Sequence, residues 1–259
     1  MILIGLPRTG TTWVQEYIHA AHKGVSLPQN NSDEFFNPYY IHKDIDKKIK
    51  FLESARSNNI DVYVKYFPEH ISDDIISKYT KHHHTTITHK HSNTKIWPWF
   101  KEFYKDTNVL ILKRRSLWKS YISSWFHITI NSQVPEAVNN LEIHPWHNFN
   151  SDDEDRLLET IKKYNIQFKF NSTFFEYYTE TVRFLNNDIQ NHFTNAEIIW
   201  LEDLTHKFLQ NKFNVEITPK TRPFKLDCED YFSNEELSLM KEKYNERFES
   251  EFKFYGYSS

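Results

Sequence analysis

The sequence predicts an α/β fold, a three-layer sandwich with a mainly parallel central sheet. Short apolar runs with the length of buried strands alternate with helical patterns along the chain. The first apolar run also passes through a short loop with two glycines directly into a helical pattern. With 259 residues, 39% of them hydrophobic, the chain is long enough to bury one full core. We therefore expect a single domain over residues 1–259.

The individual elements follow from periodicity and from turn residues. Strands are expected at 2–6, 61–66, 108–112 and 197–201. Helices are expected from Thr11 toward Gly24 and over 43–57, 114–126, 154–170, 172–190 and 234–252. Residues 25–40 and 130–153 are rich in turn formers and are expected to be loops. In a parallel sheet, ligands bind at the carboxyl ends of the strands, so the first strand–loop–helix turn is the place to look for a site.

Charge and composition exclude several classes of protein. A net charge of −3 and a pI near 6.5 give no general attraction to nucleic acid. No apolar run approaches the roughly 18 residues that a membrane-spanning helix needs. The single cysteine, Cys228, excludes an internal disulfide. We expect a cytoplasmic protein without nucleic-acid partners; its oligomeric state stays open.

The strongest signal is the segment from Gly5 to Trp13. Its glycines, Gly5 and Gly10, have the spacing of a Walker A loop, which turns backbone N–H groups and a helix N-terminus toward an anion. Thr11 stands where a triphosphate enzyme has its lysine, and Arg8 supplies a cation within the loop instead. A tight turn alone would explain Gly10 but not the arginine with its hydroxyl-bearing neighbours.

A second basic motif follows the third expected strand. Arg114 and Arg115 come at the end of that strand, and Ser123 lies eight positions after Arg115. Arginine offers a fixed fork of donors for phosphate oxygens, and a serine hydroxyl can complete such a site. The register is open, because Arg114 or Ser124 can take the same roles. The alternative is a solvated basic helix start.

Together the two motifs resemble those of the sulfotransferases that use 3′-phosphoadenosine 5′-phosphosulfate (PAPS), in style closest to the bacterial carbohydrate-type members. The resemblance implies a fold like that of the P-loop nucleotide hydrolases, PAPS as donor, adenosine 3′,5′-bisphosphate as product, no metal, and a carbohydrate or other small-molecule acceptor. It also implies that Arg114 or Arg115 with Ser123 holds the 3′-phosphate, and that Trp13 lies near the adenine. The 5′-phosphosulfate would be held by the loop residues Pro7, Arg8, Thr9, Gly10, Thr11 and Thr12.

Three residues are candidates for catalysis. Arg8 would stabilise charge on the leaving phosphate. Glu34 lies in the segment 32–38, which resembles the carbohydrate-type segment that carries the proposed base; an exposed loop carboxylate is the alternative. Lys65 lies near the end of the second expected strand and is expected near the transferred group, with a surface lysine as the alternative.

Two further patterns are given no catalytic role. The histidines of segment 82–91 lack the spacing of a metal site, and the late strand with Glu202-Asp203 is interpreted as structural, capping the helix that follows it. Two other functions remain: a P-loop nucleotide or small-molecule kinase, and a non-catalytic nucleotide-binding protein of the same fold.

Overall fold

The computed structural model describes residues 1–21, 36, 45–60, 62–79, 95–136, 151–218 and 227–258, except for the side chains of 151–154. The chain divides into two compact units. Unit 1 comprises Met1–Lys113 and Phe175–Ile217, and unit 2 comprises Arg114–Phe174 and Thr218–Ser259. A single sulfotransferase domain over 1–259 stays a prediction.

Unit 1 is built on four parallel strands in the order β2-β1-β3-β4. They are β1 (Ile2–Gly5), β2 (Val64–Tyr66), β3 (Val109–Lys113) and β4 (Glu197–Trp200). β1 is central, with Leu3 paired with Lys65 of β2 and Gly5 paired with Leu112 of β3. The prediction of an α/β fold with a parallel sheet is confirmed, with strand ends displaced by no more than a few residues.

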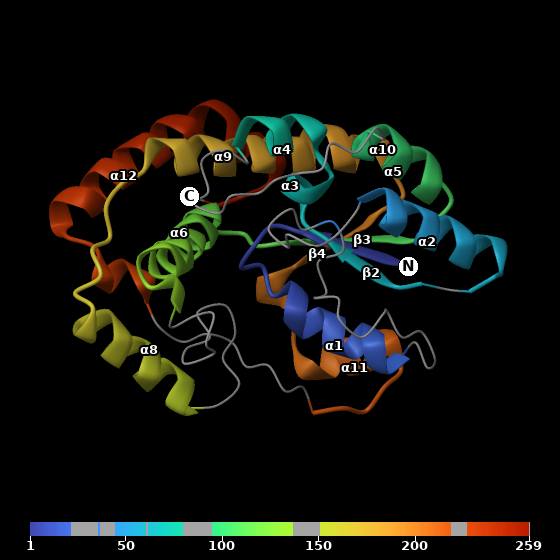
Figure 1. Cartoon of the computed structure of the whole chain (residues 1–259), viewed down its shortest axis with the longest axis horizontal. Helices are drawn as coiled ribbons and strands as arrows, with labels where there is room; N and C mark the ends of the chain where they lie inside the picture. The colour runs from blue at the N-terminus through green and yellow to red at the C-terminus, as the bar shows by residue number, and fades with distance from the viewer. Residues whose placement is uncertain are drawn as a thin grey trace. The chain divides into compact units, whose positions relative to one another are not determined.

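Helices cover both faces of this sheet (Figure 1). One face carries α1 (Thr11–Ala21) and α11 (His206–Phe213). The other carries the helices α2 (Ile45–Ser57), α3 (Pro68–Ile71), α4 (Asp73–Tyr79), α5 (Ile96–Tyr104) and α10 (Gln190–His192). Because parallel strands are covered on both faces, they are apolar throughout, and every residue of β1, β2 and β3 is buried.

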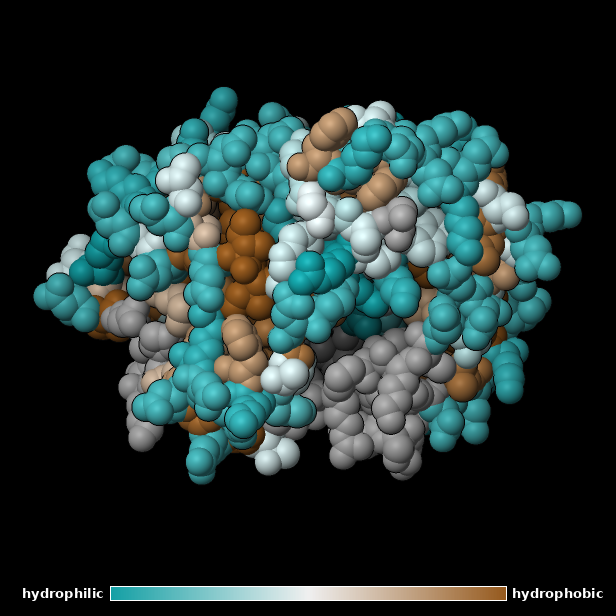
Figure 2. All heavy atoms as spheres, turned by 180° about the vertical axis from the view of Figure 1, so that it is seen from behind, coloured by the Kyte–Doolittle hydropathy of each residue, from teal (hydrophilic) through white to brown (hydrophobic). Residues whose placement is uncertain are grey.

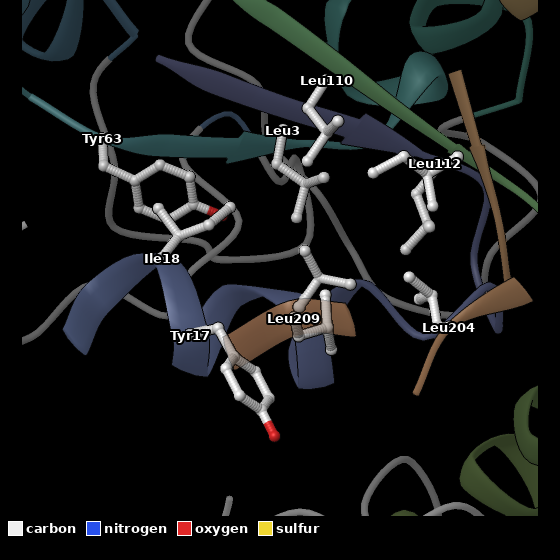
Figure 3. Close-up of a cluster of buried hydrophobic side chains, with 10 residues drawn as sticks. Leu3, Tyr17, Ile18, Tyr63, Leu110, Leu112, Leu204 and Leu209 are labelled. Atoms are coloured by element: carbon white, nitrogen blue, oxygen red, sulfur yellow. The ribbon is translucent and has the colours of Figure 1, made fainter. Parts of the chain in front are cut away.

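The first core layer lies between the sheet and the α1–α11 pair, as Figure 3 shows. Leu3 of β1 and Leu112 of β3 point down from the sheet toward Ile18 of α1 and Leu209 of α11. Val14, Tyr17 and Ile18 of α1 are fully buried. This packing fixes the direction in which α1 leaves the loop after β1.

The opposite face is packed by aromatic rings. The Tyr66 ring of β2 lies edge-on to Phe100 of α5, and its hydroxyl is 2.7 Å from that of Tyr104. Helix α5, which contains Pro98, was not predicted. Proline is tolerated there because it occupies the first turn, where its missing N–H costs no hydrogen bond.

The predicted helix over 172–190 has an irregular end. α9 (Ser172–Arg183) passes into a π-helical segment, η1 (Phe184–Ile189), before α10. The predicted final helix ends in the same way, since α12 (Asn234–Arg247) continues as the π-helical η4 (Phe248–Phe252). Helical periodicity predicts that a segment is helical but not the inserted residue that widens one turn.

Unit 2 is helical in its described part. It contains α6 (Leu117–Gln133), α8 (Ser151–Lys163), the 3₁₀ turns η3 (Cys228–Tyr231) and η5 (Lys253–Tyr255), and α12 with η4. The Trp118 indole of α6 donates to Glu229 Oε1 at 2.8 Å and lies edge-on to Tyr244 of α12. The predicted helix over 114–126 begins three residues later, at Leu117, because the Ser116 hydroxyl caps it by accepting from the Lys119 N–H.

Hydrophilic side chains cover most of the coloured surface in the view of Figure 2, with smaller hydrophobic areas between them. This agrees with the 26% of charged residues in the chain. Among the described residues, no helix has the length and apolar character needed to cross a membrane.

Candidate functional site

The strand order of unit 1 indicates where a ligand would bind. From β1 the chain moves to β2 on one side, whereas from β3 it moves to β4 on the other. Ligands of doubly wound sheets bind at the carboxyl ends of two such strands, because the two connections diverge and leave a crevice there. In this chain those ends are Gly5 and Lys113. We call this region, including the ends of β2 and β4, the carboxyl edge.

The loop between β1 and α1 has an unusual backbone. Arg8 has φ 64° and Gly10 has φ 80°, both in the left-handed region, with Thr9 between them outside it. Alternation of this kind turns successive N–H groups toward one point and forms an anion-binding concavity. Glycine enters the left-handed region freely, but arginine does so at a cost of about 1–2 kcal/mol. A strained arginine in a loop is a reason to expect function there.

The loop is also closely packed. A Cβ on Gly5 would lie 2.7 Å from Thr11 Cγ2 and 3.0 Å from Leu112 O, so the chain can fold back over this position only if it is glycine. The Thr9 hydroxyl is fully buried and donates to the Leu6 carbonyl at 2.6 Å. Thr9, predicted to hold phosphate, therefore uses its hydroxyl to shape the loop, and its backbone N–H is the group left for an anion.

The N-terminus of α1 follows directly. Val14 N–H bonds to Gly10 O at 3.1 Å, and helix geometry leaves the earlier N–H groups without a partner inside the helix. The first turn contains no acidic residue that would compete with an anion for these groups. Thr11 is buried, whereas Thr12 is half-buried. The predicted positions 10–12 thus lie at a helix start with the polarity that an anion needs.

Trp13, predicted near the adenine, contacts His206, the first residue of α11. The two rings meet edge-on with centroids 5.1 Å apart, and Tyr17 Oη lies 2.6 Å from His206 Nδ1. The indole is half-buried, so part of it is accessible to a ligand. Contact with adenine stays a prediction. α11 is capped by Thr205, whose hydroxyl accepts from Phe208 N–H, rather than by Glu202 or Asp203 as expected.

Lys65 is buried, which corrects the surface alternative. It is 2% exposed and pairs with Leu3, so it lies on the face of the sheet that carries α1. Its ammonium group is 5.3 Å from the centroid of the Phe67 ring, and within the described part of the chain it makes no hydrogen bond or ion pair. A buried cation is costly unless an anion accompanies it. An anionic ligand at the carboxyl edge would offset this cost, so the burial of Lys65 indicates that an anion binds there.

Other buried charges lie in the same unit. Among the described residues the buried ionisable side chains of Lys, Arg, Asp and Glu are three lysines and one glutamate, all in unit 1: Lys48, Lys65, Lys113 and Glu69. Burial together with the charges of Lys48 and Lys65 lowers the pKa of His70 to about 3, so its imidazole is neutral at pH 7. These described charges sum to an excess of positive charge, which favours an anion.

Lys113 was not singled out by the sequence. It ends β3 and donates to two neutral amide oxygens, Asn186 Oδ1 and Gln190 Oε1, each at 2.6 Å. Burial lowers the pKa of its ammonium group to about 8. In the sequence Lys113 directly precedes two arginines and so resembles the start of a basic surface helix. Its hydrogen-bond partners are more than 70 positions away, so the sequence pattern does not reveal its burial.

The second predicted phosphate motif belongs to unit 2. Arg114 is half-buried and Arg115 is exposed, immediately before the Ser116 cap of α6. Ser258 N–H donates to the Arg115 carbonyl at 2.9 Å, which fixes the backbone there. Ser123 and Ser124 are both buried in α6, but the Ser124 hydroxyl donates to the Ser120 carbonyl. The choice between Ser123 and Ser124, and a ligand shared by the two motifs, stay predictions.

Two predictions concern the possible base and the histidine-rich segment. Glu34 and the histidines of segment 82–91 lie outside the described residues, so their roles stay predictions. Within the described part, no group of three or more His, Cys, Asp or Glu side chains is placed to hold a metal ion.

No protein-family model, curated protein or solved structure matches this chain. The relation to sulfotransferases therefore stays a resemblance of motifs.

Proposed function

We propose that the chain is a sulfotransferase of the P-loop type, which takes the sulfuryl group of PAPS and transfers it to a hydroxyl of a carbohydrate or other small molecule. The observation that carries this proposal is the loop with left-handed Arg8 and Gly10 at the start of α1, with the buried ammonium group of Lys65 on the same face of the sheet. The anion site is inferred from the geometry. That the transferred group is a sulfuryl group is inferred from the motifs.

In the proposed reaction the acceptor oxygen attacks sulfur, and the bond between sulfur and the bridging oxygen of the 5′-phosphate breaks. The products are a sulfate ester and adenosine 3′,5′-bisphosphate, and a base takes the hydroxyl proton. Negative charge builds up on the leaving phosphate, where the loop N–H groups, Arg8 and Lys65 can stabilise it. Glu34 is the proposed base. Fixed donors and cations supply this stabilisation without a metal.

The proposal is tested by comparing two ligands in thermal melts. Adenosine 3′,5′-bisphosphate should stabilise the protein more than ATP with magnesium, because it carries phosphates for both motifs whereas the loop lacks the lysine that binds a γ-phosphate. At 100 times its Kd a ligand adds about 2.7 kcal/mol to the free energy of unfolding. For a chain of this size the melting temperature should rise by about 5–10 °C.

A matched pair of variants makes the test specific for the loop. Arg8→Gly is compatible with the left-handed backbone and removes the cation, so most of the ligand-induced shift should disappear. Asn59→Gly is the control: it also replaces a left-handed residue by glycine, just after α2, where Asn59 has φ 54°. The ligand-induced rise in melting temperature should be unchanged in this variant. A larger shift with ATP–magnesium would favour the kinase, and no shift with either ligand would reject both nucleotide enzymes.

A further inference from the structure

Two polar side chains of unit 1 are buried without a hydrogen-bond partner in the described part of the chain. One is Lys65 of β2, and the other is Gln15 of α1, which is also 2% exposed. The Oε1 atom of Gln15 is buried and accepts no hydrogen bond from a described residue. A buried polar atom of this kind is costly, and a ligand that supplies the missing donor would remove the cost. Gln15 is therefore a candidate for contact with a ligand.

Contacts on either side of Gln15 define its position along the sheet. Thr11, one turn earlier on the same side of α1, meets the end of β1, since a Cβ on Gly5 would lie 2.7 Å from Thr11 Cγ2. His19, one turn later, lies edge-on to Tyr63, with ring centroids 5.2 Å apart. α1 therefore runs from the carboxyl edge back along the sheet, and Gln15 faces the sheet midway between these contacts.

This position is level with Lys65. From the contact between His19 and Tyr63, four residues back along α1 and two residues forward along the strand cover nearly the same distance, about 6 Å. These steps lead to Gln15 and to Lys65. Tyr63 belongs to the core cluster between the sheet and α1 (Figure 3), and Lys65, two residues further on, lies on the same face. The two buried polar side chains are thus neighbours in the layer between α1 and β2.

Both side chains are directed toward the carboxyl edge. Side chains of a helix tilt toward its N-terminus, which for Gln15 is the loop after β1. The ammonium group of Lys65 lies 5.3 Å from the ring centroid of Phe67, the residue that follows β2. Lys65 does not donate to Gln15 Oε1, since that oxygen has no hydrogen-bond partner. A hydrogen-bond donor and an acceptor therefore lie near each other, about one helical turn from the proposed anion site.

This combination of donor and acceptor favours one kind of ligand group. Phosphate and sulfuryl oxygens only accept hydrogen bonds, so an anion alone satisfies Lys65 and leaves Gln15 Oε1 without a donor. A hydroxyl group donates one hydrogen bond and accepts others, so it can bind both side chains. The three N–H groups of Lys65 also allow it to contact a hydroxyl and an anion together.

We propose that Gln15 and Lys65 bind a hydroxyl group of the acceptor next to the one that receives the sulfuryl group. The pair would make the protein selective for acceptors with neighbouring hydroxyls. The inference rests on the proposed function, because it assumes a sulfuryl acceptor at the carboxyl edge. The bound hydroxyl is not the reacting one, since neither an amide oxygen nor an ammonium group can take its proton.

The hydroxyl is assigned to the acceptor rather than to the ribose of the donor. Trp13 and Tyr17 lie on the side of α1 that contacts His206 of α11, whereas Gln15 lies on the side toward β2. Adenine is predicted near Trp13, so the side toward β2 is left for the acceptor. Adenosine 3′,5′-bisphosphate and its 2′-deoxy analogue should therefore bind with the same Kd. A tenfold difference that disappears in Gln15→Met would assign the pair to the ribose and overturn the proposal.

The main test uses the whole chain, PAPS and pairs of acceptors that differ by one neighbouring hydroxyl, among them cyclohexane-1,2-diol and cyclohexanol. We expect kcat/KM per hydroxyl to be about 100-fold higher for the diol, because the mono-alcohol leaves buried polar groups unpaired. Gln15→Met keeps the length of the side chain but removes the acceptor, so the preference should fall to about tenfold or less. Gln210→Met, at a half-buried position of α11, is the control and should keep the preference.

Thermal melts of the ligand-free protein give an independent measurement. Gln15→Met removes a buried amide that lacks a described partner, so the melting temperature should stay the same or rise. A fall of several degrees would show that Gln15 has a structural partner, and the inference would be wrong. Equal kcat/KM for diol and mono-alcohol in the wild type would also reject it and leave the proposed function intact. If the wild type transfers the sulfuryl group to none of the acceptors, the proposed function fails and the inference fails with it.

Discussion

Gly10 and Leu201 are in direct contact: a Cβ on Gly10 would lie 2.6 Å from Leu201 Cδ1. The loop after β1 is therefore packed against the 3₁₀ turn η2 (Leu201–Asp203) that follows β4. This contact joins two segments almost 200 positions apart and sets the height of the loop above the sheet.

Gly10→Ala should thus damage both the loop and its site. The φ of 80° costs any L residue energy, and Leu201 must move to admit the methyl group. We expect the free energy of unfolding to fall by about 1–3 kcal/mol and anion binding to weaken. Gly256→Ala is the control, since Gly256 also has φ 80° but ends η5 in unit 2. It should destabilise without changing the Kd for adenosine 5′-monophosphate, which lacks the 3′-phosphate assigned to the second motif.

Lys65→Met should have opposite effects on stability and on binding. Removal of a buried ammonium group that lacks a described partner relieves a desolvation cost, so the melting temperature should stay the same or rise. Affinity for adenosine 3′,5′-bisphosphate should drop about 10- to 100-fold, the value of a charge-assisted contact. Lys50→Met, at an exposed position of α2, is the matched control. Destabilisation of Lys65→Met by several kcal/mol would instead assign Lys65 to a structural ion pair.

The register of the second motif is resolved by a comparison of ligands. Arg115→Ala should weaken binding of adenosine 3′,5′-bisphosphate by several-fold to a hundredfold, and binding of adenosine 5′-monophosphate much less, because only the first ligand has a 3′-phosphate. Arg114→Ala is measured in parallel by calorimetry. If Arg114→Ala shows the selective loss and Arg115→Ala does not, the half-buried arginine makes the contact.

Glu34→Gln tests the base. We expect kcat to fall by about 10²–10⁴ in single-turnover assays, with donor affinity nearly unchanged, since the amide keeps the size of the side chain but cannot accept the proton. Turnover close to that of the wild type would remove Glu34 from this role and direct attention to Glu69 or His70, which are both buried.

His70 predicts how stability depends on pH. Its pKa is about 3 in the folded protein and 6.5 when exposed, so the unfolded chain binds the proton more tightly. The contribution of His70 to stability is therefore complete above pH 6.5 and is lost as the pH falls toward 3, at up to about 1.4 kcal/mol per pH unit. Urea unfolding at several pH values should show this slope. His70→Gln should reduce it, and a substitution of the exposed His192 should not.

Much of the sheet could be predicted from the sequence because buried strands leave a local signature. A short apolar run such as Val109–Leu112 is typical of a strand that is buried on both faces of a sheet. The loop from Gly5 is recognised because two of the few glycines lie there, between a strand and a helix. The left-handed backbone at Arg8 was not predicted, since arginine has no preference for that region.

The part of the site that was missed depends on distant residues. Lys113 is indistinguishable in sequence from the arginines beside it, and only the π-helical turn near Asn186 makes it a buried cation. His70 is a similar case, since its burial beside Lys48 and Lys65 depends on three separate elements. Patterns of one or two turns in length do not contain such information.

The strand order has a consequence for synthesis of the chain. β3 lies between β1 and β4, yet Glu197 follows Lys113 by 84 positions, so the ribosome needs about 4–17 s to supply the last strand. Until then one side of Val109–Lys113 is an open, apolar edge of the kind that pairs with other chains. The nascent protein is thus most vulnerable to aggregation after its glycine loop is complete and before its sheet is, which is the interval in which a chaperone would protect it.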